Sequence, residues 1–228
     1  MTQGVHPDSS GASVLEHVLG DHETIPEDMG VFLEETRRMH PKVCRFVSEA
    51  FYEGRLGSIP ACAERTTSDG VGVRWLDVVH EGNSVDSEEE AAAIASEIER
   101  LLGHTFRDGR VERPLRHADV MVVAPYNAQV RLLRERLPRA VEVGTVDKFQ
   151  GREAAVVFYS MASSSGEDVP RGLDFLMSRN RLNVAVSRAQ CVAYVASSPR
   201  LLEVDCRTVE HLKLANALCR FVELAARS

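Results

Sequence analysis

The sequence predicts an α/β fold in which helices cover both faces of a mostly parallel sheet. Several apolar runs of strand length lack the alternation of a half-exposed strand: residues 116–126, 141–146, 154–162 and 191–198. Strands that are buried on both faces have this pattern. Segments with helical periodicity fall between most of these runs, so strand and helix alternate along the chain. Together the two observations predict a three-layer α/β domain.

The first elements of the chain are expected to be short. We expect a helix over Ala12–Leu19, and then a strand or turn within residues 29–41. That segment stops before Pro41, because a residue that precedes proline disfavours the helical region. Pro41 suits the first turn of a helix that runs to Tyr52, in which apolar residues recur near helical spacing. Residues 70–80 form the next expected strand.

The clearest helix of the chain covers residues 86–103. Ser87 is its expected N-cap, and Glu90 at the third helical position completes a capping box. Gly103 directly follows its last turn. Further helices are expected over residues 127–137, the first half of residues 178–198, and residues 208–228.

The composition is that of an ordinary soluble globular protein. The chain has 228 residues, of which 44% are hydrophobic and 27% charged, and its length suits one large domain. No apolar run approaches the length of a membrane-spanning helix, so we expect no membrane partner. The five cysteines form no C-x-x-C pair, which favours a reducing cytoplasm without a disulfide framework or a zinc site.

The net charge of −7 argues against a surface that binds nucleic acid all round. Acidic residues cluster at 86–90, however, which leaves room for a local basic groove elsewhere. Arginines concentrate in residues 107–116 and 131–139. By default we interpret such runs as solvated faces.

Three polar segments beside strands carry arginines: residues 36–41 (TRRMHP), 146–153 (VDKFQGRE) and 180–189 (NRLNVAVSRA). In parallel α/β sheets, ligands bind at the carboxyl ends of the strands. The position of these segments beside strands is therefore the first indication of a functional site.

Each segment has both a chemical and a structural interpretation. Gly151 permits a positive φ and a close backbone approach to an anion, but an ordinary turn between two strands also explains it. Arg37 and Arg38 can fork hydrogen bonds onto phosphate oxygens, or they belong to a surface cluster balanced by neighbouring acids. The small residues around Arg188 let a phosphate come close; alternatively, the arginine caps or bridges helices.

The order and spacing of four stretches resemble the second RecA-like domain of superfamily 1 helicases, in the branch that contains the RNA-surveillance and Dna2-type enzymes. FLEETRRMHPKVCRFVSEAFYEGRL is similar to the Y-R-M-H-P … F-Y-x-G-x-L signature of that branch, and VVAPYNAQVRLL to its T/A-P-Y-x-x-Q motif. GTVDKFQGREAAVVFYS is similar to T-V-D-x-F-Q-G-x-E, and NRLNVAVSRA to R-R-L-N-V-A-x-[ST]-R-A. The resemblance runs from Val31 to Ser198 and implies a RecA-like fold.

The resemblance also implies catalytic and nucleotide-binding roles. Arg38 and Arg188 would act as arginine fingers on the γ-phosphate of ATP bound between two RecA-like domains. Gly151 and Glu153 would lie near the γ-phosphate or the ribose. Gln150 would link that site to the nucleic-acid groove.

A face for single-stranded DNA or RNA is implied as well, contacted mainly through the sugar-phosphate backbone. Its residues would be Pro125, Tyr126, Gln129, Thr145, Asp147 and Lys148. One position departs from the family pattern: this chain has Arg37 where the family usually has tyrosine. A guanidinium plane can also stack on a base, so Arg37 is a candidate for nucleotide binding with an altered base preference.

The chain contains no G-x-x-x-x-G-K-[ST] loop, because GHTFRDGR lacks both the lysine and the hydroxyl residue. We therefore expect it to be the C-terminal part of a longer helicase, in which ATP and Mg²⁺ bind at the first RecA-like domain. That domain would be its partner, and the isolated chain would lack ATPase activity. Residues 1–30 would be a connector, residues 31–204 the second RecA-like domain, and residues 205–228 a helix packed on it.

Two other functions stay open from the sequence. One is a non-catalytic RecA-like module that binds nucleic acid or regulates a partner. The other is an NTPase that remodels protein–nucleic-acid complexes without unwinding a duplex. A P-loop and a D-E-x-x segment upstream would favour the motor over the module.

Overall fold

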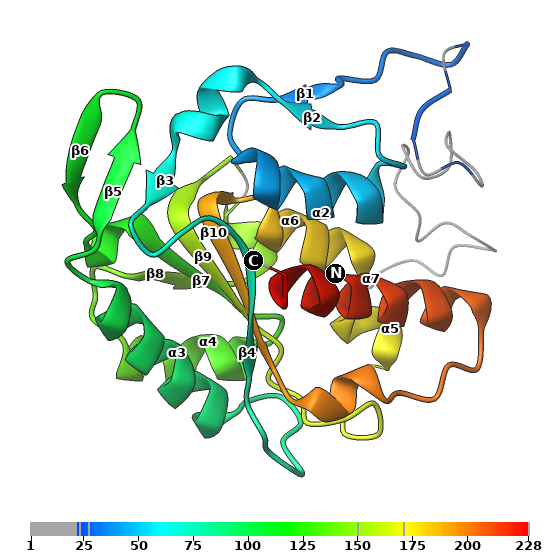
Figure 1. The fold of residues 1–228 in the computed structure, drawn as a ribbon. Helices are drawn as coiled ribbons and strands as arrows, with labels where there is room; N and C mark the ends of the chain where they lie inside the picture. The colour runs from blue at the N-terminus through cyan, green and yellow to red at the C-terminus, as the bar shows by residue number, and fades with distance from the viewer. Residues whose placement is uncertain (1–21, 23, 27, 150, 171, 228) are drawn as a thin grey trace, which may run out of the picture.

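The computed structural model describes residues 22, 24–26, 28–149, 151–170 and 172–227. At its centre is a parallel sheet with strand order β4-β10-β9-β7-β8 (Figure 1). The strands are β4 (Gly72–Asp77), β7 (Val120–Val123), β8 (Glu142–Gly144), β9 (Ala154–Ser160) and β10 (Ala189–Ser197). The predicted α/β class and each of these predicted strands are confirmed. The expected helix Ala12–Leu19 and most of the expected connector lie outside the described residues.

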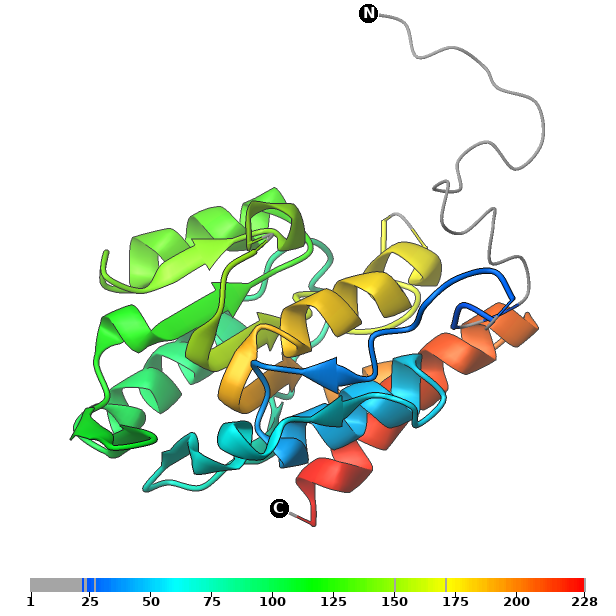
Figure 2. The same ribbon diagram turned by 90° about the horizontal axis from the view of Figure 1, so that it is seen from above.

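Helices cover both faces of this sheet, and Figure 2 shows the resulting layers. One face carries α3 (Glu88–Leu101) and α4 (Asn127–Arg136). The other carries α2 (Pro41–Phe51), α5 (Leu173–Leu176), α6 (Arg179–Val186) and α7 (Val209–Ala225). No helix within the described ranges has the length and apolar character needed to cross a membrane.

Strand β9 explains why the apolar runs lack alternation. Val157 and Tyr159 pack into the core beneath α2, α6 and α7. Val156 and Phe158 pack into the opposite core beneath α3 and α4, where Phe158 stacks on Tyr194 at 4.5 Å between ring centroids. Because both faces of the strand are covered, every position is best filled by an apolar side chain.

The arginine-rich residues 107–116 form most of a hairpin, on which Arg107 and Arg110 are exposed, as expected of a solvated face. Strands β3 (Thr66–Thr67), β5 (Thr105–Asp108) and β6 (Val111–Pro114) make a small antiparallel sheet that projects at the left of Figure 1. Asp108 pairs with Val111 across a two-residue turn in which Gly109 has φ +57°. The two turn residues are Gly109 and Arg110, and a glycine at the first central position is a hairpin signal, so the sequence did contain this information.

The remaining elements are short. A two-stranded parallel ribbon, β1 (Glu35–Thr36) and β2 (Gly57–Ser58), lies beside α2. The short 3-10 helices are η1 (Pro60–Glu64), η2 (His117–Asp119), η3 (Val146–Phe149) and η4 (Pro199–Leu202). Helix α2 begins at Pro41, as predicted, and the Nδ1 atom of its N-cap His40 accepts from the Lys42 amide at 3.1 Å.

The predicted capping box of α3 is half correct. The Ser87 hydroxyl accepts from the Glu90 amide at 3.0 Å, as expected for an N-cap. The Glu90 carboxylate does not return to the Ser87 amide, which donates instead to Gln129 Oε1 at 2.8 Å. Gln129 supplies the acceptor from α4, and this leaves Glu90 free to turn into the core.

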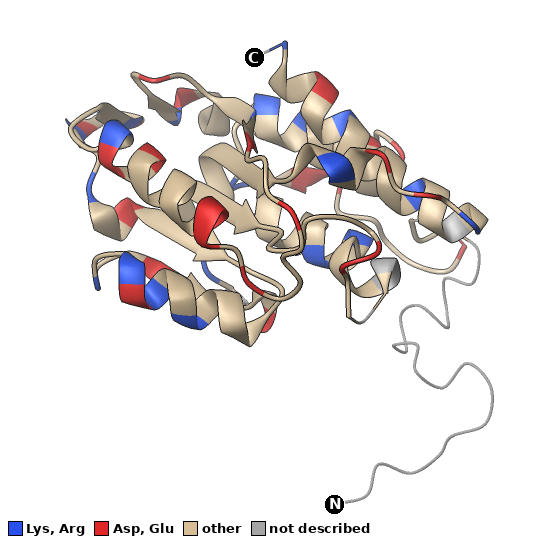
Figure 3. Ribbon diagram, turned by 90° about the horizontal axis from the view of Figure 1, so that it is seen from below, with Lys and Arg blue, Asp and Glu red and all other residues tan. Residues whose placement is uncertain are grey.

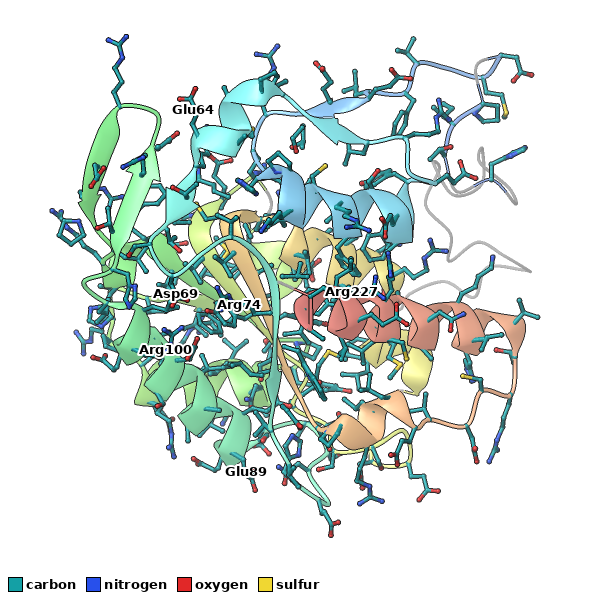
Figure 4. The ribbon with its side chains drawn as sticks, viewed as in Figure 1. Glu64, Asp69, Arg74, Glu89, Arg100 and Arg227 are labelled. Carbon is teal, nitrogen blue, oxygen red and sulfur yellow. The ribbon has the colours of Figure 1, made fainter. Side chains whose placement is uncertain are left out.

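Helix α3 is also tied to the segment that leads into β4. Arg100 donates two hydrogen bonds to the Asp69 carboxylate, at 2.7 and 2.9 Å, and Arg74 lies on the other side of Asp69 (Figure 4). These bonds hold the pKa of Asp69 below its ordinary value. Bidentate pairs of this kind fix geometry as well as charge, so they set the position of α3 against the edge of the sheet.

Candidate nucleotide-facing site

The three arginine-bearing segments meet at the amino ends of β9 and β10. Glu153 directly precedes β9 and Arg188 directly precedes β10, and the two strands are parallel neighbours with Ala189 opposite Ala154. Arg38 reaches them from the turn between β1 and α2. Carboxyl ends are the usual ligand edge of parallel sheets. Here the arginines lie at the opposite edge, because Glu153 and Arg188 come before their strands in the chain and Arg38 reaches the same end.

Arg38 is fixed by two hydrogen bonds at this edge. Its Nε donates to Glu153 Oε2 at 2.8 Å, and one terminal nitrogen donates to the Ser187 carbonyl at 2.9 Å. The two side chains are 27% and 42% exposed, so their ion pair adds little to the free energy of unfolding. Its main effect is to orient the guanidinium group of Arg38.

Glu153 is held in turn by Gln190, a residue that the sequence analysis did not single out. Gln190 Nε2 donates to Glu153 Oε1 at 2.9 Å, and the Gln190 carbonyl accepts from the His40 amide at 2.8 Å. Both oxygens of the carboxylate are therefore engaged. Residues from all three arginine-bearing segments join one hydrogen-bonded network, which only the folded chain reveals.

Arg188 is half-buried and lies close to Arg38. Within the described part of the chain, its buried Nε has no hydrogen-bond partner. Burial lowers the pKa of Arg188, and the charge of Arg38 lowers it further, although Tyr52 acts in the opposite direction. An unbonded buried donor costs about 1–3 kcal/mol, and two adjacent cations repel each other. This arrangement is unfavourable for a purely structural arginine and well suited to an anion.

Arg38, but not Arg188, borders a hollow of about 510 Å³. Arg37, Arg38 and Glu153 line it on the polar side, and Phe32 and Tyr52 line it on the apolar side. The two aromatic rings lie 5.9 Å apart between centroids. The hollow thus combines guanidinium groups with aromatic surface, as expected of a site for a phosphorylated aromatic ligand.

Arg65 holds the backbone of Arg37 and Arg38, and sequence reasoning missed it. One of its terminal nitrogens donates to the Arg37 and Arg38 carbonyls, each at 2.9 Å, and its Nε donates to Asp108 at 3.1 Å. Burial opposes the charge of Arg65, but Asp108 outweighs it, so the pKa of Arg65 is raised. Arg65 therefore joins the hairpin to the backbone of Arg37 and Arg38. It lies outside the recognised motifs, and no local pattern marks it.

The residues expected to face a single strand divide into several groups. Pro125 and Tyr126 follow β7, are buried, and border a hollow of about 470 Å³, with the Tyr126 ring 5.4 Å from that of Phe175. Thr145 follows the neighbouring strand β8 and is partly exposed. Because β7 and β8 are parallel, these residues lie at one edge, the carboxyl edge, of the sheet.

Gln129 does not face the solvent, contrary to the expectation from the motif. Its side chain is fully buried. Its Oε1 accepts from the Ser87 amide at 2.8 Å, and its Nε2 donates to Ser160 Oγ at 2.9 Å. All its polar atoms are thus used in joining α4 to α3 and β9. Its role in this structure is to position α4.

The segment after β8 carries the remaining predicted residues. Asp147 and Lys148 are exposed on η3, and Lys148 Nζ donates to the Val143 carbonyl at 3.0 Å. Gln150 lies outside the described residues. Gly151 has φ +80°, the left-handed conformation that its residue type suggested, and it is exposed.

A second polar network lies entirely inside the protein. Glu90 accepts hydrogen bonds from Ser160 Oγ at 2.6 Å and the Ala162 amide at 2.9 Å, and contacts His80 Nε2 at 3.0 Å. His80 Nδ1 lies 2.7 Å from Ser164 Oγ. These side chains are buried, so no substrate reaches them. They connect α3 to the carboxyl end of β9.

Comparison with known proteins assigns the fold to a family. A family model described as an AAA domain matches residues 11–200. The chain is 31% identical over 175 residues to DNA polymerase alpha-associated DNA helicase A of Schizosaccharomyces pombe, which covers 69% of this chain and 26% of that protein. It is 32% identical over 168 residues to DNA-binding protein SMUBP-2 of Rattus norvegicus, covering 67% and 16%.

A regulator of nonsense transcripts 1 homolog of Arabidopsis thaliana is 29% identical over 195 residues, covering 75% of this chain and 14% of that protein. The chain thus spans about a quarter or less of these relatives. A solved C-terminal domain of a possible DNA helicase from Lactobacillus plantarum matches with a TM-score of 0.39 and 14% identity, over 73% of this chain and 89% of that one. From the family match, the chain belongs to the AAA domain family that forms the C-terminal region of superfamily 1 helicases of the Upf1, SMUBP-2 and Dna2 type.

Proposed function

We propose that this chain is the C-terminal motor domain of an ATP-dependent helicase, in which Arg38 and Arg188 contact the γ-phosphate of ATP held by a facing RecA-like domain. The observation that carries the proposal is the buried, unbonded Nε of Arg188 beside a second arginine. A phosphate that approaches this pair relieves the repulsion between the two cations and supplies the missing acceptor.

The chemistry follows from where charge accumulates during phosphoryl transfer. The transition state spreads negative charge over the γ-phosphate oxygens, and arginine fingers that neutralise it raise the rate by about 10³–10⁵. Glu153 and Gln190 hold Arg38 in a fixed orientation, so little reorganisation is required when the phosphate arrives. Guanidinium groups line the site and both oxygens of the Glu153 carboxylate are engaged, so the site suits a phosphate.

The single-strand groove and the phosphate site would communicate along one segment. Residues 145–149 and 151–153 lie between the carboxyl end of β8 and the amino end of β9, and this segment includes Thr145, Asp147, Lys148 and Glu153. In the proposal, a shift at the nucleic-acid end of the segment is passed on to Glu153 and so to Arg38. In the proposed cycle, ATP binding closes the two RecA-like domains and hydrolysis lets them open again. The two domains bind the single-stranded nucleic acid alternately, and this moves the protein along it.

The test uses a polypeptide that carries both RecA-like domains. We expect Arg188→Ala to reduce nucleic-acid-stimulated ATPase strongly while single-strand binding, measured by fluorescence anisotropy, stays near the wild-type level. Arg45→Ala is the matched control, since Arg45 is an exposed arginine of α2 that pairs with Glu49 away from the site. Near-normal turnover of the Arg188→Ala protein would remove the basis for the proposal and leave a non-catalytic binding module.

A further inference from the structure

Beside the open edge of the central sheet, a hollow of about 520 Å³ collects four basic side chains. Arg134 comes from α4, Arg139 from the turn that follows α4, Lys148 from η3, and Arg152 from the approach to β9. The single acidic residue of its lining, Glu142, pairs with Arg152. The lining is thus strongly positive, whereas the whole chain has a net charge of −7.

Two of these cations converge on one oxygen atom. A terminal nitrogen of Arg134 donates to the Val143 carbonyl at 3.1 Å, and Lys148 Nζ donates to the same carbonyl at 3.0 Å. Within the described part of the chain, neither forms an ion pair, and Arg139 forms neither a hydrogen bond nor an ion pair. Cations held this close repel each other, and an anion placed between them removes that cost.

Protection of the sheet edge explains only part of this arrangement. Strand β8 is the last strand of the sheet, and basic side chains often cover such edges against pairing with another chain. The Val143 carbonyl has two lone pairs, so edge protection accounts for both of its donors, Arg134 and Lys148. It gives no reason for Arg139, which donates to none of the edge strand's polar atoms among the described residues.

We propose that this basic hollow binds the phosphodiester backbone of single-stranded nucleic acid and extends the groove beyond the family motifs. The inference deepens the proposed function and rests on it. Lys148 belongs both to the hollow and to the predicted nucleic-acid segment, so one strand can follow both without a break. The four cations suit phosphodiester oxygens, and contacts to the backbone carry no sequence information.

The test measures binding of a fluorescein-labelled oligo(dT) 20-mer to the 228-residue chain by anisotropy over a series of salt concentrations. Arg134→Gln/Arg139→Gln is expected to weaken binding about tenfold at low salt. It should also reduce the slope of log K against log salt by about 1.4, since each lost phosphate contact accounts for about 0.7 on a single strand. Arg139→Gln alone should give about half that change, and it breaks no hydrogen bond or ion pair within the described residues.

The control is Arg45→Gln/Arg200→Gln, which removes the same charge from two exposed arginines paired with Glu49 and Glu81. An equal loss of affinity in this control overturns the proposal, since net charge would then explain the effect. So does an unchanged salt slope in Arg139→Gln, or the absence of binding by the wild-type chain. A competition experiment separates the nucleic-acid backbone from free phosphate as the ligand. If inorganic phosphate displaces the oligonucleotide more strongly than chloride does at the same ionic strength, the hollow is a site for a free anion instead.

The proposal for this hollow and the proposed motor function can fail separately. Arg134 and Arg139 lie at the β8 edge, and neither lines the hollow that contains Arg38. If ATPase survives the loss of Arg188 while the salt slope still falls in Arg139→Gln, the hollow stands and the motor assignment fails. If ATPase is lost in Arg188→Ala while the salt slope is unchanged in Arg139→Gln, the motor assignment stands and the nucleic-acid role of the hollow fails.

Discussion

At Arg188 the chain holds a charge that burial and a second arginine both disfavour. Arg38 beside it is oriented by Glu153, and Glu153 by Gln190. Each of these bonds is partly exposed and adds little to stability, so the network is better explained by the geometry it gives to Arg38 than by the free energy it contributes.

The first prediction concerns Glu153→Gln. The amide keeps the size of the side chain but removes the charge that faces Arg38, so the orientation of the guanidinium group becomes less defined. We expect the free energy of unfolding to change by less than about 1 kcal/mol, because the pair is exposed to solvent. Nucleic-acid-stimulated ATPase of the protein with both RecA-like domains should fall clearly. A large loss of stability in urea denaturation without loss of ATPase would show that the pair is structural.

A second prediction at this scale concerns pH and Asp69. The hydrogen bonds from Arg100 lower the pKa of Asp69 in the folded state, so its contribution is complete above the pKa of the unfolded state, about 3.9, and is lost as the pH falls through the folded value. Asp69→Asn should therefore destabilise the protein by about 1 kcal/mol at pH 7. The difference should shrink below pH 4. A difference that is constant from pH 7 to pH 3 in denaturant titrations would contradict the role of this carboxylate.

Among the elements, α3 shows how a helix end is joined to the core. The N-cap bond of Ser87 is local, but Glu90 and Gln129 connect the first turn of α3 to β9 and α4. These connections place the start of α4, and with it Pro125 and Tyr126, relative to the sheet.

The third prediction is that Glu90→Ala destabilises the protein by about 3 kcal/mol or more. The substitution leaves Ser160, His80 and the Ala162 amide without their buried acceptor, and each orphaned group costs about 1–3 kcal/mol. Glu89→Ala on the exposed side of the same turn is the control, with an expected change below about 1 kcal/mol. Equal effects of the two substitutions in urea denaturation would mean that the buried network contributes little.

The fourth prediction concerns the hairpin formed by β5 and β6. Arg65→Met removes the bonds to Asp108 and to the carbonyls of Arg37 and Arg38. Amide hydrogen exchange should then accelerate at residues 37–39 and in the hairpin, while α3 stays protected. Asp108→Asn should have a smaller effect, because an amide oxygen still accepts from Arg65. Unchanged exchange at residues 37–39 would show that the hairpin does not support the candidate arginines.

The helices and central strands were predictable because their signals are local: periodicity, caps and two-sided burial. The hairpin was also marked locally, by Gly109 at the first position of its turn, and Arg107 and Arg110 on it are exposed, as expected of a solvated face. The missing half of the capping box could not be predicted, because Gln129 replaces Glu90 from another helix. Arg65 and Gln190 act through contacts far apart in sequence, which no single segment reveals.

On the scale of the whole molecule, the polar features separate onto two edges of one sheet. Arg38 and Arg188 lie at the amino ends of β9 and β10. The predicted nucleic-acid residues Pro125, Tyr126 and Thr145 lie at the carboxyl ends of β7 and β8. Helix α4 runs from the carboxyl end of β7 back towards the amino end of β8 and carries three arginines, Arg131, Arg134 and Arg136 (Figure 3). A chain with net charge −7 can therefore bind nucleic acid locally while its remaining surface stays acidic.

The proposed motor function depends most on Arg38 and Arg188 acting on the same phosphate. The most direct measurement is the rate of ATP cleavage in a single turnover, for each alanine variant and for the double variant, in the protein with both RecA-like domains. We predict that each single substitution lowers the rate by about 10³-fold and that the double variant loses much less than the product of the two effects. A rate for Arg188→Ala within a few fold of the wild type would contradict the account.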